Sequence, residues 1–180
     1  MMVPQTPYTN GSISKLKGVT ANNLLAVGGS GPQAFMWRFN GSDWTTISSF
    51  PSTLSALSDV DSKDGEWVFG SCEGGEGVLM STLNFQDWTV VENPEVGCMS
   101  TVWMPWKGAS LAGASLAGDV IQPGDARLHV RSQGECSSGE PIDGLAVGVN
   151  SIIPLTGSTF LIATQGYGGG TTRSYIGSYQ

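Results

Sequence analysis

The sequence predicts an all-β fold, and the prediction rests on composition and on one internal repeat. Glycine supplies 26 of the 180 residues, and only 13% of the residues are charged. Gly and Asn tolerate the positive φ angles of tight hairpin turns, so this composition favours many short strands. No window shows apolar residues at i, i+3, i+4 and i+7 flanked by Lys and Glu, the pattern of an amphipathic helix. The motif Asn-x-x-Asp-Trp-Thr occurs twice, once from Asn40 and once from Asn84.

The repeat has a period of 44 residues, the separation of Trp44 and Trp88. Each copy reads as strand, Gly-rich turn, strand, polar turn and strand, and two weaker copies follow, led by CMSTVWMP and GLAVGVNSIIPL. A period of 40–45 residues with three or four strands per unit is typical of a β-propeller blade. We therefore expect one domain, a small propeller of about four antiparallel blades, and the alternative is an array that is open or completed by a partner. The expected blades span residues 12–54, 55–97, 98–143 and 144–180, with residues 1–8 closing the last.

The repeated turn residues have a structural interpretation. A large ring at the start of a blade's outer strand can wedge between neighbouring sheets, while the Asn or Asp of the turn binds exposed backbone N–H groups. This predicts equivalent structural roles for the two copies of the motif, Asn40, Asp43 and Trp44 in the first and Asn84, Asp87 and Trp88 in the second. The alternative is that each Trp forms a platform on which a sugar stacks.

The second copy of the motif resembles the Asp-box (BNR) turn of sialidase-like propellers, S-x-D-x-G-x-x-W. Ser81 and Trp88 match that pattern, whereas Leu83 and Phe85 stand where it has Asp and Gly. The first copy keeps the Gly, at Gly41, and the Trp. The resemblance implies a propeller architecture. It implies no single activity, because such propellers serve as hydrolases, lectins, assembly factors and scaffold proteins.

No group of residues has the pattern of a catalytic centre, so we expect a protein that is not an enzyme and has no cofactor. The sialidase chemistry that the resemblance raises uses three arginines and a Tyr nucleophile. The four arginines of this chain are scattered, at Arg38, Arg127, Arg131 and Arg173. His129 lies in an alternating strand pattern without a neighbouring nucleophile, which favours a structural role.

Two further groups of residues raise the question of metal binding. The stretch DVDSKDGE is most simply a solvated loop, and a weak alternative is a calcium loop with Asp59, Asp61 and Asp64 as oxygen ligands. The cysteines are odd in number and contain no CxxC pair, at Cys72, Cys98 and Cys136. We expect all three to be reduced and to bind no metal.

Residues 103–106 read Trp-Met-Pro-Trp and are the candidate interface. Trp103, Met104 and Trp106 are of the types that anchor protein interfaces, and Pro105 is placed to turn the strand into a loop. If they are exposed, they anchor a protein or a sugar. If they are buried, they belong to the core.

Charge and composition indicate a structural or adaptor module. The net charge is −7 with no basic cluster, which argues against nucleic-acid binding, and no apolar run is long enough for membrane insertion. The sequence starts without the pattern of a signal peptide, although its surface is of the Ser/Thr/Gly-rich kind common in extracellular shells. We therefore expect a virion component of a tailed phage (head decoration, tail adaptor or receptor-binding part) or another extracellular protein, and otherwise a cytoplasmic one. Its expected partners are other protein subunits in an oligomeric assembly. The alternative is a lectin-like propeller that binds cell-surface glycans.

Overall fold

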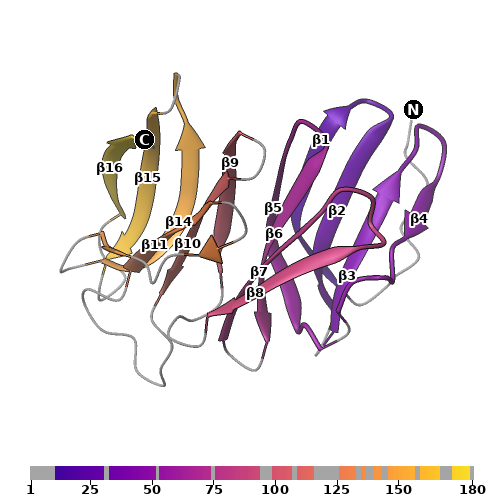
Figure 1. The fold of residues 1–180 in the computed structure, drawn as a ribbon, viewed down its shortest axis with the longest axis horizontal. Helices are drawn as coiled ribbons and strands as arrows, with labels where there is room; N and C mark the ends of the chain where they lie inside the picture. Colours follow the sequence, from indigo (N-terminus) through magenta and orange to yellow (C-terminus); the bar gives the residue numbers. More distant parts are fainter. Residues whose placement is uncertain are drawn as a thin grey trace.

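In the part of the chain that the structure describes, four antiparallel β-sheets follow one another and lie in a row (Figure 1). The computed structural model describes residues 11–30, 33–51, 53–73, 76–93, 99–106, 109–115, 126–132, 135–136, 140–142, 146–156, 159–166 and 172–178. Within these ranges the chain forms β-strands and no helix, so the prediction of an all-β fold is confirmed. It follows that no helix in the described part of the chain could cross a membrane.

The first two sheets each contain four strands in sequential order. The first sheet consists of β1 (Ser12–Thr20), β2 (Asn23–Ser30), β3 (Gln33–Phe39) and β4 (Trp44–Thr46). The second sheet consists of β5 (Ala56–Lys63), β6 (Glu66–Glu73), β7 (Glu76–Thr82) and β8 (Trp88–Asn93).

The last two sheets lie in the half of the chain where the repeat is weak. The third sheet consists of β9 (Thr101–Trp106), β10 (Ala109–Ser115), β11 (Ala126–Ser132), β12 (Glu135–Cys136) and β13 (Glu140–Pro141). The fourth sheet consists of β14 (Ala146–Pro154), β15 (Thr159–Gly166) and β16 (Thr172–Ser178). Each of the four expected blades contains one of these sheets. The expected closing segment, residues 1–8, lies outside the described residues.

The sheets stack face to face, and the core is divided among the layers between them. The layer between the first and second sheets holds Leu25, Met36, Phe69 and Met80. Smaller apolar layers join the second sheet to the third and the third to the fourth. Strands β6 and β7 are buried along nearly their whole length because a sheet covers each of their faces. This explains why they read as continuous apolar runs instead of alternating patterns.

Two glycines let successive sheets approach closely, one where the second sheet meets the third and one where the third meets the fourth. A Cβ atom on Gly70 of β6 would lie 3.1 Å from the Cβ of Met99, just before β9. A Cβ atom on Gly113 of β10 would lie 2.5 Å from Val149 of β14. Any larger residue would push the first strand of the next sheet away.

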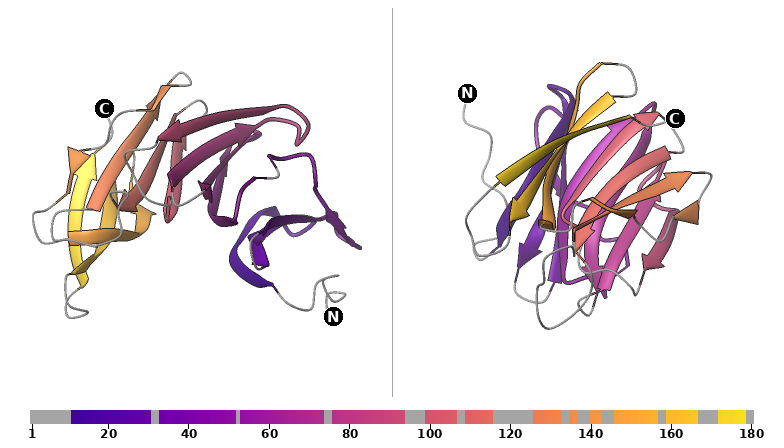
Figure 2. Two further views of the ribbon diagram at one scale, coloured as in Figure 1. Left: turned by 90° about the horizontal axis from the view of Figure 1, so that it is seen from below. Right: turned by 90° about the vertical axis from the view of Figure 1, so that its left-hand side faces the viewer.

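The row of sheets is curved, and its two ends lie apart. The first sheet and the fourth sheet occupy opposite ends of the row (Figure 1), and from below the row forms an arch whose ends turn toward the same side (Figure 2). The described strands therefore form an open array of four sheets.

Candidate functional site

The first copy of the repeated turn is held by its asparagine. The Oδ1 of Asn40 accepts hydrogen bonds from the backbone N–H groups of Ser42 and Asp43, both at 2.9 Å. Gly41 has a φ of 103°, a left-handed conformation that glycine adopts without strain. Trp44 then begins β4.

The second copy repeats this arrangement without the glycine. The Oδ1 of Asn84 accepts from the N–H groups of Gln86 and Asp87, at 2.8 and 2.9 Å. Phe85 has a φ of 60°, so a non-glycine residue occupies the left-handed position. Its ring is buried 5.6 Å from the ring of Trp67, and this packing offsets the backbone strain, which is on the order of 1 kcal/mol.

Trp44 and Trp88 lie on equivalent faces of successive sheets but have different surroundings. Trp88 is paired with Thr82, on the face of the second sheet that packs against the first, and its ring lies 5.5 Å from that of Phe69. Trp44 is paired with Phe39, on the face of the first sheet that points away from the second. Both are half-buried. Trp88 is thus a wedge between two sheets, and Trp44 holds the same position where no described sheet precedes it.

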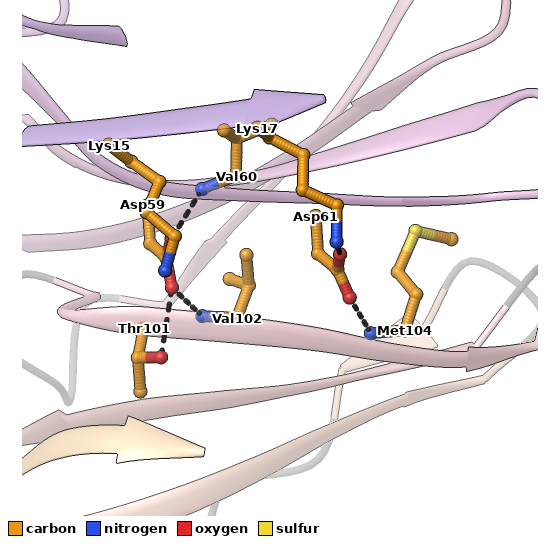
Figure 3. A network of polar contacts seen from close by, with 8 residues as sticks. All are labelled: Lys15, Lys17, Asp59, Val60, Asp61, Thr101, Val102 and Met104. Atoms are coloured by element: carbon orange, nitrogen blue, oxygen red, sulfur yellow. Dashed lines mark hydrogen bonds and ion pairs between the residues drawn. The ribbon is translucent and has the colours of Figure 1, made fainter. Parts of the chain in front are cut away.

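Two carboxylates of β5 join three successive sheets at their first strands (Figure 3). The Oδ2 of Asp59 accepts from the hydroxyl of Thr101 at 2.9 Å and from the N–H of Val102 at 3.0 Å. Its Oδ1 accepts from the N–H of Val60 at 2.8 Å and lies 3.0 Å from the Nζ of Lys15. Lys15 belongs to β1 and Thr101 to β9, so a single buried carboxylate connects the first, second and third sheets.

Asp61 lies two residues further along β5, on the same face of the strand, and repeats this connection. Its carboxylate pairs with Lys17 and accepts from the N–H of Met104 at 2.8 Å. The interpretation of this stretch as a solvated loop is therefore wrong, because Asp59 and Asp61 are buried within a strand. Asp64 lies instead in the hairpin turn after β5, with a φ of 49°. The carboxylates of Asp59 and Asp61 thus face N–H and ammonium donors, which would compete with a metal ion for them. Among the described residues, no group of three His, Cys, Asp or Glu side chains could hold a metal.

A cavity of about 350 Å³ lies beside the second copy of the turn, between the second and third sheets. Its lining includes a buried ion pair, with Nη1 of Arg131 at 3.0 Å from Oε1 of Glu66, while Nη2 of Arg131 donates to Ser81 at 2.9 Å. Asp87 and Trp88 also line it. The Nε1 of Trp88 is buried and has no hydrogen-bond partner among the described residues. No sequence pattern indicates this cavity, because Arg131 and Glu66 are 65 residues apart.

The prediction of an exposed interface at residues 103–106 is corrected by the burial of Trp103 and Met104. Trp103 is buried between the third and fourth sheets, with its ring 5.4 Å from that of Phe160. Met104 is buried between the second and third sheets. Neither forms an exposed anchor, because β9 continues through Pro105 and has a sheet on each side. The side chain of Trp106 lies outside the described residues.

The prediction that all three cysteines are reduced is also wrong, because Cys72 is disulfide-bonded. Cys98 and the side chain of Cys136 lie outside the described part of the chain. An odd number of cysteines left one of them without a partner in any pairing, but it did not exclude one disulfide.

The two ends of the row carry apolar faces that no described sheet covers. The head face is the outer face of the first sheet, formed by Ile13, Leu16, Ala26, Phe35, Trp37 and Trp44. The tail face is the outer face of the fourth sheet, formed by Ile153, Leu161 and Ile176. Ile13, Leu16 and Ile153 are each about half exposed, and Ile176 is 74% exposed. Ala26, Phe35 and Trp37 of the head face are buried within the single chain. Exposed large apolar side chains such as Ile13, Leu16 and Ile176 are a common mark of interaction surfaces.

Comparison with known proteins defines the fold alone. No family model matches the sequence, and none of the curated proteins matches it either. The structure is similar to that of the computationally designed Ika4 protein, with a TM-score of 0.60 and 12% identity over 97% of this chain and 94% of that one. It is also similar to a chain from the structural and mechanistic analysis of two prolyl endopeptidases, with a TM-score of 0.58 and 14% identity over 94% of this chain. The present chain spans 28% of the length of that second chain. The class defined in this way is an all-β protein of successive antiparallel sheets.

Proposed function

We propose that this protein is a non-enzymatic assembly module, an open propeller-like array that docks onto other protein subunits through its head face and tail face. The observation that carries the proposal is the position of Trp44. Trp88, its equivalent, fills the layer between two sheets, so the face that bears Trp44 has the composition of a sheet-to-sheet contact. A face of that composition at the end of a row is suited to receive a sheet from another subunit.

The polar groups of the described residues support a structural role over turnover. Asp59, Asp61 and Glu66 bind cationic side chains or backbone N–H groups within the fold, and His129 is fully buried in β11. A general acid or base must reach a substrate proton, and these groups are engaged inside the protein. A structural or adaptor component of a virion or another extracellular assembly is the role that fits the weakly charged sequence best.

Photo-crosslinking from the two end faces tests the proposal. Leu16 and Ile176 would be replaced in turn by the photoreactive residue benzoylphenylalanine, with Leu83 as the control. Leu83 is 62% exposed but lies in the turn before β8, away from both end faces. The chain would be co-expressed with the products of the genes beside its own. We expect crosslinks to protein subunits from Leu16 and Ile176 and few from Leu83. Crosslinking no stronger than the control at both positions would contradict the proposal.

Glycan binding is the second candidate, and the cavity beside Trp88 favours it. The cavity combines an aromatic ring, carboxylates and hydroxyl groups, from Trp88, Glu66, Asp87, Ser81 and Thr82. Sugar sites use such a combination. Calorimetric titration with neutral and acidic monosaccharides should then detect binding that Asp87→Asn weakens by about tenfold or more. Asp43→Asn, in the equivalent turn of the first copy, is the matched control. A titration without heat for every sugar would exclude this candidate.

A further inference from the structure

We propose that the partner on each end face is a second copy of this chain, so that two arches meet head to tail and close a ring of eight sheets. This inference rests on the function proposed above. It adds the identity of the partner and the direction of the contact.

The head face is the outward side of a sheet whose other side already packs. In β2 and β3, Leu25, Val27 and Met36 point toward the second sheet, whereas Ala26 and Trp37 form a cross-strand pair on the opposite side. Leu16 of β1 is paired with Ala26 and therefore extends the head face along the first strand. It is 56% exposed, so this end of the face is open.

The tail face is likewise the outward side of a sheet, the fourth, whose other side packs against the third sheet. Ile152, Ile162 and Tyr175 point toward the third sheet. The neighbouring residues form an apolar row across all three strands, because Ile153 is paired with Leu161 and Leu161 with Ile176. All three residues of this row are apolar, and the row ends at Ile176, which is exposed.

The contact between the first two sheets shows how one such face packs on another. The first sheet contributes Leu25, Val27 and Met36, and the second contributes aliphatic side chains together with the rings of Phe69 and Trp88. When the fourth sheet of one copy packs on the first sheet of a second copy, it takes the place of a sheet that precedes the first sheet. Its tail face would meet the part of the head face that is still exposed, which is Ile13, Leu16 and part of Trp44. No residue assigned to either face is charged, so the net charge of −7 is not concentrated at the contact.

The shape of the row favours two copies over an endless chain. A head-to-tail contact forms a closed ring when the rotation between copies closes and a filament when it does not. Both ends of the arch turn toward the same side (Figure 2), so two arches that face each other bring each head face onto a tail face. Closure in this way also covers the sheet faces that a single open array exposes.

Phe35 and Trp37 limit how much of the head face a second copy can cover. Both side chains are already buried in the single chain, at 5% and 2% exposure. The area that remains for the partner is Ile13, Leu16 and the exposed part of Trp44. Residues 1–10, which precede β1 at this end of the row, are the competing occupant of that area.

Light scattering of the purified full-length chain tests the inference. We expect a mass of twice the chain mass of 18.8 kDa. Leu16→Asp and Ile176→Asp should each reduce it to one chain, because a carboxylate in an apolar contact between sheets would be desolvated without a partner. Leu83→Asp, outside both faces, should leave the mass doubled. Far-UV circular dichroism and thermal melting check that each variant remains folded.

Directional crosslinking separates a head-to-tail contact from any other dimer. A chain carrying Leu16→Cys, mixed with a chain carrying Ile176→Cys and oxidised, should form an intermolecular disulfide between residues 16 and 176, identified by peptide mass spectrometry. A mixture of Leu16→Cys with Leu83→Cys is the control. Crosslinking in the control alone would overturn the head-to-tail arrangement.

Three results would overturn the inference. One is a full-length chain that keeps the mass of one copy at every concentration. Another is a dimer that both aspartate substitutions leave intact. The third is a full-length monomer that dimerises once residues 1–10 are removed, which would make that segment the occupant. A monomer that still crosslinks to another protein from Leu16 and Ile176 would refute the second copy and leave the assembly function standing.

Discussion

Replacement of Asp59 should destabilise the fold more than any exposed charge on the chain. Its buried carboxylate accepts from two backbone N–H groups, of Val60 and Val102, and from the hydroxyl of Thr101. In Asp59→Ala these donors lose their acceptor, and because each unsatisfied buried donor costs about 1–3 kcal/mol, we expect a total loss of about 3–5 kcal/mol. Lys15 adds little, less than about 1 kcal/mol, because its side chain is 47% exposed and solvent screens the ion pair.

Urea unfolding followed by tryptophan fluorescence measures this loss. Asp59→Asn keeps one acceptor oxygen and should lose roughly half as much as Asp59→Ala. Asp43→Ala, at an exposed turn position, is the matched control and should cost less than about 0.5 kcal/mol. An Asp59→Ala variant within about 1 kcal/mol of the wild type would refute the view that this carboxylate holds three sheets together.

A double-mutant cycle assigns the effect to the contact between sheets. Thr101→Val removes the hydroxyl of β9 that donates to Asp59. If the two residues act through their hydrogen bond, the double variant should be more stable than the sum of the single losses implies, by about 0.5–3 kcal/mol. Strict additivity would mean that the hydrogen bond from the Thr101 hydroxyl contributes nothing to stability, and would leave the N–H of Val102 as the contact of Asp59 with β9.

Three further outcomes follow from single features of the structure. Arg131→Met should cost about 3–5 kcal/mol because it removes the guanidinium from the buried Glu66, and adding Glu66→Leu should recover most of the loss in urea unfolding. Thiol titration in denaturant should find one free thiol without reductant and three with it, because Cys72 is disulfide-bonded and the chain has three cysteines. Peptide mapping without reductant then identifies the partner of Cys72. A titration of three thiols without reductant would contradict the disulfide. Gly41→Ala should cost about 1–2 kcal/mol of stability, because φ is 103° there and the new Cβ would lie 2.9 Å from the side chain of Asn22. An unchanged melting temperature would show that the turn relaxes.

The sequence by itself determined the local structure of the protein. Glycine-rich turns between apolar runs dictate short antiparallel strands, because the conformation of a turn depends on the residues within it. Asn40 and Asn84 could be recognised as equivalent because each binds N–H groups two and three residues ahead, within the reach of one motif.

Only the tertiary structure decided which face of each strand is covered and by what. Asp59 looked like a loop carboxylate because its partners, Lys15 and Thr101, are 44 and 42 residues away and belong to other sheets. Trp103 looked like an exposed anchor because nothing local shows that Phe160 lies against it. The same limit applies to Trp44 and Trp88, whose motifs are alike although one faces a sheet and the other the end of the row. The burial of a side chain depends on how the sheets stack, and stacking brings together residues that no sequence window contains.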